Sequence, residues 1–441
     1  MRFMDRLIRE TMEGRRVLLL GFGREGQSTY RVLRKVLPGQ LLTIADANEA
    51  IREHELLCND GQLAFRLGSG YLEGLAEFDL IVKSPGITLK DIPYSLAGTV
   101  ITSQADLFLR RYAPRVIGVT GTKGKSTTAS LVYHILDNAG KDAVLLGNIG
   151  TPAFHFLDRI REETRIVFEL SSHQLEHVER SPRIAVLLNL YQEHLDAYRS
   201  FDEYQQAKMN IARFQEKGDS FIYNADDPLV AGHIRSHPWP QQLVPVTLSA
   251  PGSYHFHNRY LKGEHNLLNT FAAVAACRIA GLDDTEIAEG IDSFKGLAHR
   301  MEYVGRYHGI DFYDDSIATI PEACMAAVRA IPGVDTLLLG GFDRGVSYSG
   351  LAEFLLSSEV RTFIVTGMAG ARIAEALVKS GLREKRLIRI HRFDEFLAHA
   401  VKYTAPGRVC LLSPAAASYD EFRSFEERGM RFAELARTGT P

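Results

Sequence analysis

The sequence predicts an α/β protein with three domains: an N-terminal Rossmann-like domain, a central P-loop ATPase-like domain built on a parallel sheet, and a C-terminal Rossmann-like domain. At 441 residues the chain is too long for one hydrophobic core. Short apolar runs alternate with helical patterns, which is typical of parallel sheets. Two of these runs end in glycine-rich turns that open a helix. We expect the domains to span residues 1–112, 113–298 and 299–441.

The first domain begins with a β-turn-α-β unit of the doubly wound type. An apolar run ends in a glycine-rich turn, a helical pattern follows, and a second strand ends at an acidic residue. Another strand closes in a Ser-Pro-Gly turn. In order, these elements are Arg16–Leu20, Gly21–Gly26, a helix to Val36, Leu41–Ala45 with Asp46, and Leu80–Val82 with Ser84.

The central domain follows the same plan with a different loop. An apolar strand enters a glycine-rich loop and then a helix that ends at a glycine C-cap. Two more strands, a linker rich in His and Gly, and a final helix complete it. The expected elements are Val116–Val119, the helix Thr127–Asn138 before Gly140, the strands Ile166–Glu169 and Ala185–Asn189, the linker at 250–265, and the helix Leu267–Ala280.

The third domain has three apolar runs separated by helical stretches. They are Thr336–Leu339, Thr362–Val365 and Val409–Leu412. Because strands again alternate with helices, we expect a mostly parallel sheet.

The composition excludes several classes of protein. The net charge of −3 gives no strongly basic face, so neither nucleic acid nor a membrane surface is expected as a partner. The N-terminus lacks the apolar core of a signal peptide, and no apolar run is long enough to cross a bilayer. Four distant cysteines, Cys58, Cys277, Cys324 and Cys410, lie in apolar or helical surroundings, which indicates reduced structural thiols. We expect a cytoplasmic monomer.

The segment Gly121-Thr122-Lys123-Gly124-Lys125-Ser126-Thr127 follows an apolar strand and opens a helix, the context that a phosphate-binding loop requires. Its glycines let backbone N–H groups face a triphosphate, and the helix N-terminus adds partial positive charge. Lys125 is expected to contact the β- and γ-phosphates, and the Ser126 hydroxyl to bind Mg²⁺. The first glycine is not where the pattern G-x-x-x-x-G-K-[ST] places it, which argues against a motor protein or GTPase. The alternative is a turn that merely caps a helix.

Two further strand ends carry polar residues at the edge where an open parallel sheet binds its ligands. Glu169 closes one strand, and a carboxylate suits Mg²⁺ that also contacts phosphate oxygens. His194 follows the next strand and is a candidate second metal ligand. Alone, each is more often a surface or helix-capping residue. Their placement beside the phosphate loop favours a metal site.

Several long motifs, in this order, resemble the Mur ligase family. They are Thr120–Thr127, Gly147–Gly150, Glu169–Glu176, Asn189–Asp196, Asn224–Asp227, Gly263–Asn266 with Asn269, and Ala298–Arg300. In addition, Leu412–Ser418, Phe425 and Arg428-Gly429 resemble the signature of members that add D-glutamate to UDP-N-acetylmuramoyl-L-alanine. The resemblance covers nearly the whole chain. It implies an ATP-dependent amide-bond ligase of peptidoglycan precursor synthesis that works through an acyl phosphate.

The resemblance implies a role for each matching position. The catalytic positions are Lys125, Asn148, His194 and Lys208, and the positions for two Mg²⁺ ions are Ser126, Glu169, His194 and Lys208. Lys208 matches a lysine that is carbamylated in the family, whereas most lysines are simply exposed. ATP is expected to contact Gly121–Thr127, Asn266, Asn269, Arg300 and Asp315. The UDP substrate is expected to contact Gly21, Phe22, Gly23, Arg24, Glu25, Gly26, Asp46, Ser84, Asn148, Ser171 and Gln174, and glutamate to contact Thr319, Arg344, Ser418 and Phe425.

Two positions depart from the family pattern. The D-glutamate members usually have Asp-Ser-Lys-Ala-Thr-Asn where this chain reads Asp315-Ser316-Ile317-Ala318-Thr319-Ile320, so Ile317 replaces a cation. Arg344 stands where a lysine is usual, and a guanidinium offers a bidentate fork in place of a point charge. Because both changes fall near the amino-acid pocket, L-glutamate is an alternative to D-glutamate.

Three other functions compete with this interpretation. An NAD-dependent oxidoreductase fits the turn Gly21–Gly26 but leaves the phosphate loop unexplained. A non-catalytic nucleotide-binding regulator is disfavoured because the expected metal ligands are all present. A folylpolyglutamate synthase-like ligase is the nearest competitor within the family. The N-terminal dinucleotide-type domain and the Ser413-Pro414 segment argue against it.

Overall fold

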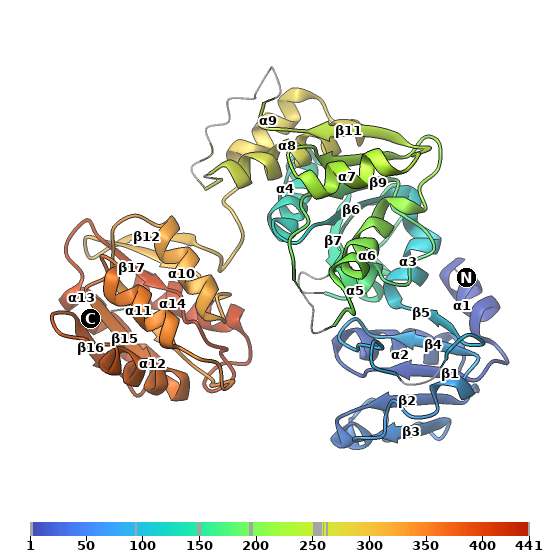
Figure 1. Ribbon diagram of the computed structural model, residues 1–441, viewed down its shortest axis with the longest axis horizontal. Helices are drawn as coiled ribbons and strands as arrows, with labels where there is room; N and C mark the ends of the chain where they lie inside the picture. Colours follow the sequence, from blue (N-terminus) through green and yellow to red (C-terminus); the bar gives the residue numbers. More distant parts are fainter. Residues whose placement is uncertain are drawn as a thin grey trace. The chain divides into compact units, whose positions relative to one another are not determined.

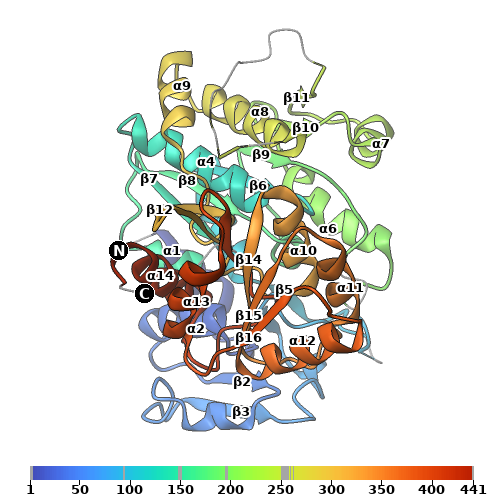
Figure 2. The same ribbon diagram turned by 90° about the vertical axis from the view of Figure 1, so that its left-hand side faces the viewer.

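The computed structural model describes residues 3–92, 95–147, 151–193, 197–249, 258, 260–261 and 263–439. The chain forms two compact units, Met1–Phe294 and Lys295–Pro441 (Figure 1). Two β-sheets lie in the first unit and one lies in the second, and helices pack against each of them (Figures 1 and 2). The predicted α/β fold class is therefore confirmed. The boundary expected at residue 112 stays a prediction.

The first sheet has the strand order β3-β2-β1-β4-β5, and all neighbours pair in parallel. Leu18 and Leu20 of β1 face one apolar core, while Val17 and Leu19 face another, which explains the uninterrupted apolar run. The helices α1, α2 and α3 pack together on the second of these cores. The bounds are α1 (Phe3–Met12), β1 (Val17–Leu20), α2 (Arg24–Val36), β2 (Leu42–Asp46), η1 (Glu49–Glu53), β3 (Leu63–Leu67), η2 (Leu75–Glu77), β4 (Leu80–Lys83), β5 (Val100–Thr102), α3 (Gln104–Tyr112) and η3 (Ala113–Arg115).

The second sheet has the order β11-β10-β9-β6-β8-β7, also with parallel neighbours. Its elements are β6 (Val116–Thr120), α4 (Lys125–Asn138), β7 (Ala143–Gly147), η4 (Ala153–Phe156), β8 (Arg165–Glu169), α5 (Ser172–Leu175), β9 (Ile184–Leu187), α6 (Phe201–Arg213), β10 (Ser220–Asn224), α7 (Pro228–Ser236), β11 (Gln242–Val246), α8 (Glu264–Ile279) and α9 (Asp284–Ser293). The helices α4, α8 and α9 pack on one face. The other face shares a core with the first sheet's helices, where the rings of Phe108 and Phe168 lie 5.5 Å apart. This shared core joins the two sheets into one unit.

The third sheet has the order β12-β13-β17-β14-β15-β16, and only β12 is antiparallel among these strands. One core contains residues of α10, α11 and α12, and a second core contains residues of α13 and α14, so helices cover both faces. The bounds are β12 (Glu302–Tyr307), β13 (Ile310–Asp314), α10 (Pro321–Ala330), β14 (Val334–Gly340), α11 (Ser349–Ser357), β15 (Thr362–Thr366), α12 (Gly367–Lys379), β16 (Arg386–Arg389), η5 (Phe393–Glu395), α13 (Phe396–Tyr403), β17 (Val409–Leu412) and α14 (Phe425–Thr438).

The predicted ends of several helices and strands were wrong by a few residues. The helix expected from Thr127 begins at Lys125, because the phosphate loop enters helical geometry directly after Gly124. The strand expected to reach Asn189 ends at Leu187, and the helix expected at Leu267–Ala280 is Glu264–Ile279. Much of the linker at 250–265 lies outside the described residues.

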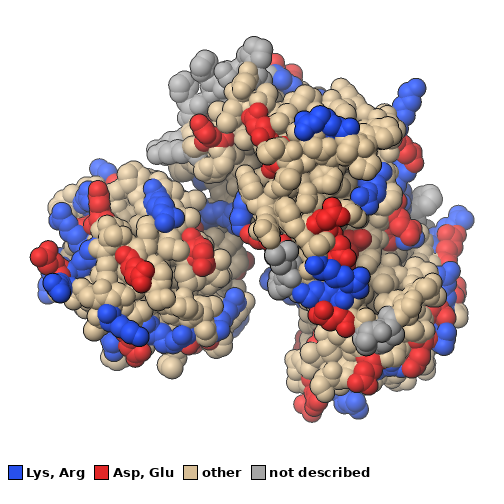
Figure 3. Space-filling model, in the orientation of Figure 1, with Lys and Arg blue, Asp and Glu red and all other residues tan. Residues whose placement is uncertain are grey.

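All four cysteines are free; three are buried, but Cys58 is exposed in a turn, so it lies in neither the apolar nor the helical surroundings expected for it. Within the described ranges, no helix combines the length and apolarity needed to cross a membrane. On the face drawn in Figure 3, acidic and basic side chains are interspersed.

Candidate active site

The phosphate loop connects β6 to α4, and two of its glycines have backbone conformations that other residues rarely adopt. Gly121 has a φ of 155° and Gly124 a φ of 85°. A Cβ atom on Gly121 would lie 2.9 Å from the Cβ of Leu188, and one on Gly124 would lie 2.4 Å from Oδ1 of Asn269. The loop therefore requires glycine at both positions, and α8, which carries Asn269, lies against it.

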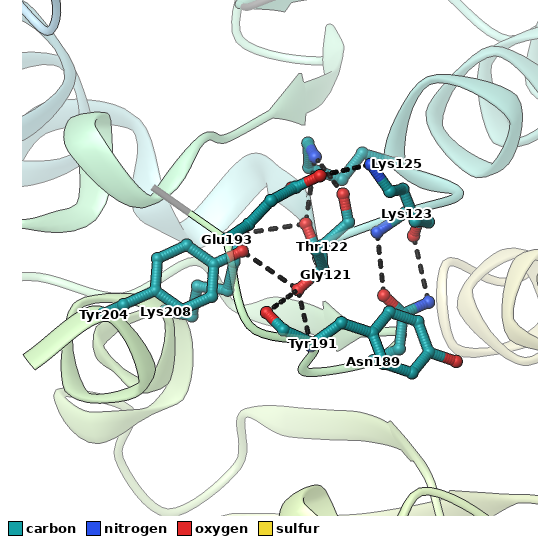
Figure 4. A network of polar contacts seen from close by, with 9 residues as sticks. All are labelled: Gly121, Thr122, Lys123, Lys125, Asn189, Tyr191, Glu193, Tyr204 and Lys208. Atoms are coloured by element: carbon teal, nitrogen blue, oxygen red, sulfur yellow. Dashed lines mark hydrogen bonds and ion pairs between the residues drawn. The ribbon is translucent and has the colours of Figure 1, made fainter. Parts of the chain in front are cut away.

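Asn189, just beyond β9, holds the loop in shape (Figure 4). Its backbone carbonyl accepts a hydrogen bond from the Thr122 N–H at 3.0 Å, and its side-chain Oδ1 accepts one from the Lys123 N–H at 2.7 Å. Its Nδ2 donates to the Lys123 carbonyl at 3.1 Å. The N–H groups of Thr122 and Lys123 thus bond to Asn189, so these two loop amides do not face an open phosphate site.

Two lysines converge on the carbonyl of Gly121. Lys125 Nζ donates to this oxygen at 2.9 Å and to the Thr122 carbonyl at 3.0 Å, and Lys208 Nζ donates to the Gly121 oxygen at 2.8 Å (Figure 4). Lys208 is only 2% exposed. Burial, and then the positive charge of Lys125, lower the pKa of Lys208 well below the usual lysine value. Lys208 therefore loses its proton more readily than an ordinary surface lysine.

Oxygen donors suited to Mg²⁺ lie beside these lysines. Ser126 Oγ donates to Glu169 Oε1 at 3.2 Å, and Glu169 is fully buried at the end of β8. The charge of Glu169 also acts on Lys208, so the three residues form one cluster. Carboxylate and hydroxyl oxygens are the ligands that Mg²⁺ prefers, so this cluster fits the ion. His194 and Asn148 lie outside the described residues.

Tyr204 was missed as a site residue. Its hydroxyl lies 2.9 Å from Thr122 Oγ1, which also accepts a hydrogen bond from the Tyr191 N–H at 2.9 Å (Figure 4). Tyr204 precedes Lys208 by one helical turn of α6, so both side chains point to the loop. This spacing was the signal in the sequence. Lys123 also forms an ion pair with Glu193.

The expected ATP-contacting residues divide between the two units. In the first unit, Asn269 Nδ2 donates to Asn266 Oδ1 at 3.3 Å at the start of α8. In the second unit, Asp315 accepts hydrogen bonds from Ser413 Oγ at 2.7 Å and from the Met301 N–H at 3.2 Å. Burial raises the pKa of Asp315 to about 7, and the charge of Arg300 is among the effects that oppose this rise. Arg300 and Asp315 are therefore neighbours in the same unit.

The glycine-rich turn Gly21–Gly26 lies at the carboxyl edge of the first sheet. Ser84 Oγ donates to the Gly21 carbonyl at 2.9 Å, and Asp46 Oδ2 accepts a hydrogen bond from the Phe22 N–H at 2.7 Å. The structure thus brings together the turn, Asp46 and Ser84, as expected. The Phe22 ring is buried against Tyr30 in the core.

Glu25 connects this turn to the second sheet. Gln174 Nε2 donates to Glu25 Oε2 at 3.3 Å, and Gln174 itself forms the capping box of α5 with Ser171. Residues from both sheets, expected to contact the same UDP substrate, are therefore adjacent. Arg24 and Gly23, which belong to this turn, are exposed.

The expected glutamate-binding positions follow neighbouring strands of the third sheet. Thr319 follows β13, Ser418 follows β17 and Arg344 follows β14, so all three lie beyond the same carboxyl edge. Ser418 is buried, whereas Arg344 is exposed with its guanidinium carbon 5.8 Å from the centre of the Tyr419 ring. Phe425 begins α14, and its carbonyl accepts a hydrogen bond from Ser316 Oγ at 2.8 Å.

Arg428 organises this edge and was not among the expected site residues. Its buried guanidinium donates to the carbonyls of Ser316 at 2.9 Å, Ala416 at 3.1 Å and Ala417 at 3.2 Å. Burial lowers its pKa to about 10. The Arg428-Gly429 motif marked the position, but only the fold shows that the guanidinium also reaches the Gly340 carbonyl at 3.4 Å, so its partners lie on three separate segments.

Comparisons with known proteins agree with this geometry. A model of the Mur ligase middle domain matches residues 119–244, and a model of the Mur ligase glutamate ligase domain matches residues 299–416. A UDP-N-acetylmuramoylalanine–D-glutamate ligase of Symbiobacterium thermophilum is 36% identical, over 95% of this chain and 97% of that relative. The chain belongs to the Mur ligase family. A ligase of the same name from Geobacillus kaustophilus is 34% identical to this Mur ligase, over 94% of the chain and 96% of the relative.

Solved structures share the fold of this Mur ligase. A MurF ligase of Thermotoga maritima, solved in complex with ADP, matches with a TM-score of 0.55 at 17% identity, over 100% of this chain and 99% of that one. A UDP-N-acetylmuramate–alanine ligase (MurC) of the same organism also matches with a TM-score of 0.55, at 21% identity, over 97% of this chain and 100% of that one. At these identities the likeness shows the fold alone.

Glu25 is expected to make the stability of this Mur ligase depend on pH. Burial raises the pKa of Glu25 to about 7, while the Gln174 hydrogen bond and the charge of Lys83 oppose this effect. Because the folded state binds the proton more tightly than the unfolded state, the contribution of Glu25 to stability falls as the pH rises from about 4.5 to about 7. We expect Glu25→Gln to match the wild type in thermal unfolding near pH 4 and to exceed it near pH 8.

The control is Glu289→Gln on the exposed surface of α9. Its effect on the melting temperature at each pH is the baseline against which the effect of Glu25→Gln is compared. If the melting temperatures of Glu25→Gln and the wild type differed by the same amount at both pH values, the raised pKa would not contribute to stability as expected.

Proposed function

We propose that this chain is an ATP-dependent ligase that joins D-glutamate to UDP-N-acetylmuramoyl-L-alanine in peptidoglycan precursor synthesis. The observation that carries the proposal is the phosphate loop with its buried lysine and carboxylate, in a chain similar over nearly its full length to ligases of that name. Relatives named for D-glutamate favour this amino acid over L-glutamate, and they disfavour a folylpolyglutamate synthase-like activity.

The chemistry explains why a phosphate loop is needed. A carboxylate is a poor electrophile, and transfer of the γ-phosphoryl group of ATP to one of its oxygens gives an acyl phosphate and ADP. The amine of D-glutamate then attacks the acyl carbon, loses a proton, and expels inorganic phosphate as the amide forms. Negative charge develops on phosphate oxygens in both steps, so a cation such as Lys125 stabilises both.

We propose roles for the central residues from the family resemblance, and the contacts of the described residues support them. We assign ATP to the loop Gly121–Thr127, to Asn266 and Asn269 beside it, and to Arg300 and Asp315 in the second unit. Ser126 and Glu169, together with His194 and Lys208, would hold two Mg²⁺ ions. When bound, the ions would neutralise charge on phosphate oxygens.

Lys208 is proposed to act as a carbamate. The pKa of its amine is lowered by burial, and a neutral amine adds CO₂ with loss of one proton to give an N-carboxylate. This product places a negative oxygen donor where the unmodified side chain has an amine, beside Glu169 and the loop. The modification would thus convert Lys208 into a metal ligand.

The UDP substrate is assigned to the first domain, residues 1–112. Its diphosphate would lie at the turn Gly21–Gly26, near Asp46 and Ser84, with Ser171, Gln174 and Asn148 reaching from the central domain, 113–298. A nucleotide phosphate at a glycine-rich turn before a helix is favoured by the helix N-terminus. ATP and a UDP-sugar are small intracellular molecules, so we infer a cytoplasmic enzyme, acting as a monomer without nucleic acid or membrane partners.

Glutamate is assigned to the third domain, 299–441, at Thr319, Arg344, Ser418 and Phe425. Ile317 cannot supply the cation usual at its position; its backbone N–H donates to the His299 carbonyl at 3.2 Å and its side chain is partly buried. The exposed guanidinium of Arg344 remains available beside the Tyr419 ring for a bidentate contact with a carboxylate.

The test is ATP-dependent phosphate release with UDP-N-acetylmuramoyl-L-alanine and either D- or L-glutamate. We expect turnover with D-glutamate and at least about 10²-fold lower kcat/KM with L-glutamate, because a site built for one enantiomer leaves polar groups unpaired with the other. Equal or greater activity with L-glutamate would overturn the assignment of the amino acid. No turnover with either would overturn the assignment of the ligase.

A further inference from the structure

Lys83 is a buried cation beside the turn that is assigned to the first substrate. It ends β4, pairs in register with Leu20 of β1, and directly precedes Ser84, whose hydroxyl bonds to Gly21. Its side chain is 1% exposed, and its ammonium lies 2.9 Å from Glu176 Oε2 in the second sheet's part of the unit. Because burying an ammonium is costly, a lysine in this place requires its partner.

Glu176 ends a short segment that begins in the cluster formed by Ser126, Glu169 and Lys208. The segment starts at Glu169, which bonds to Ser126 of the phosphate loop, and it continues through α5 to Glu176. Within it, Gln174 contacts Glu25 of the glycine-rich turn. One short stretch of chain therefore contacts the phosphate loop at one end and the first sheet at the other.

Other buried polar contacts also connect the part of the unit around the first sheet to the part around the second. Gln104 Oε1 accepts a hydrogen bond from the Phe154 N–H at 3.3 Å, and Asp106 Oδ1 accepts one from the Glu179 N–H at 2.9 Å. Gln104 and Asp106 are buried. Lys83 differs from Gln104 because it has an ionisable side chain, and from Asp106 because it directly precedes Ser84, which bonds to the glycine-rich turn.

We propose that Lys83 is a positioning residue. Its pairing with Glu176 sets the distance from the diphosphate-binding turn to the phosphate loop, so that the carboxylate of the first substrate meets the terminal phosphate of ATP. The inference rests on the proposed function. A misplacement of about 1 Å in reacting groups can lower a rate by about 10²-fold, so an effect on kcat is expected.

The experiment uses Lys83→Met, Glu176→Gln and the double variant in the full-length protein. Lys83→Met leaves a partly buried carboxylate without its cation, so its melting temperature should fall, and the double variant should regain most of this loss. Despite that recovery, kcat of the double variant should stay at least about 10-fold below the wild type, while KM for ATP changes by less than about 2-fold. Glu176→Asp, which keeps the charge but shortens the reach, should show the same kcat loss with little loss of stability.

The matched control is the double variant Arg34→Met/Asp60→Asn. This pair is also largely buried, with an Nε–Oδ2 distance of 2.6 Å, but both residues belong to the first sheet's side of the unit. It should retain the wild-type kcat.

Three results would overturn the proposal: a double variant with wild-type kcat, a Glu176→Asp variant with wild-type kcat, or a rise in KM for ATP that matches the fall in kcat. The first two would leave Lys83 a structural ion pair, and the third would show a disturbed phosphate loop. A wild-type protein without ATP turnover contradicts the ligase proposal before any variant is measured, so the two failures are distinguishable.

Discussion

Replacing Lys125 with alanine is expected to lower kcat for ATP-dependent amide formation by at least about 10²–10³-fold, the loss typical of removing one group that stabilises developing charge. Lys125 opens α4, and its ammonium bonds to the carbonyls of Gly121 and Thr122. A bound triphosphate would offer this ammonium stronger, charged acceptors. Phosphate release under saturating substrates measures the effect.

The fold should survive this substitution because Lys125 is only partly buried and alanine favours a helix. Lys141→Ala is the control, since Lys141 is an exposed lysine of the same domain that pairs with Glu286 at 2.9 Å. It should leave the rate unchanged. A Lys125→Ala variant with the wild-type rate would show that the loop does not act on the nucleotide.

Replacing Lys208 with methionine should abolish activity without lowering stability. The side chains are similar in volume, and the substitution removes a buried amine whose charged form is strongly disfavoured. The Gly121 carbonyl keeps the hydrogen bond from Lys125. We expect kcat/KM to fall by at least about 10²-fold, as for other groups that act on charge in the transition state.

The carbamate on Lys208 can be detected directly. Because its pKa is depressed, the amine is neutral above the lowered pKa and can add CO₂, whereas below that pKa it is protonated and cannot. Protein equilibrated with ¹³CO₂ at neutral pH should show a carbamate carbonyl resonance that is absent from Lys208→Met. Lys385→Met, at a partly buried lysine of the second unit, is the control and should keep both the resonance and the activity. Full activity of Lys208→Met would contradict the assigned role.

The parts of the site that are local in the chain could be predicted from the sequence. The phosphate loop combines a strand, two glycines and a helix start in consecutive residues, and the structure places Gly121 and Gly124 in conformations that need glycine. Asp46 and Ser84 could likewise be predicted because they follow strands of one parallel sheet.

Contacts between distant segments could not be predicted. Lys83 and Glu176 are 93 residues apart, and the Arg428 side chain meets Ser316 across 112 residues. Neither the periodicity nor the composition of the sequence indicates which distant residues pair in the fold. For Lys208 the residue type alone favoured exposure, and its predicted role came from the family resemblance. The packing of α6 against the loop shows that it is buried.

Several strands were missed for a physical reason. β3, β11 and β16 lie at the edges of their sheets and are only partly buried, so they lack the continuous apolar runs of the inner strands. The inner strands β1, β6 and β14 are fully buried and were recognised. The antiparallel β12 was missed as well, because its residues are mostly half-buried.

The proposed ligase transfers the terminal phosphoryl group of ATP to a carboxylate. The most direct test of this transfer uses UDP-N-acetylmuramoyl-L-alanine labelled with ¹⁸O in the alanine carboxylate, together with ATP, Mg²⁺ and D-glutamate. We expect each released phosphate to carry one oxygen from the labelled carboxylate, because that oxygen bridges carbon and phosphorus in the acyl phosphate. Amide formation that releases only unlabelled phosphate, or no ATP consumption at all, would contradict this transfer.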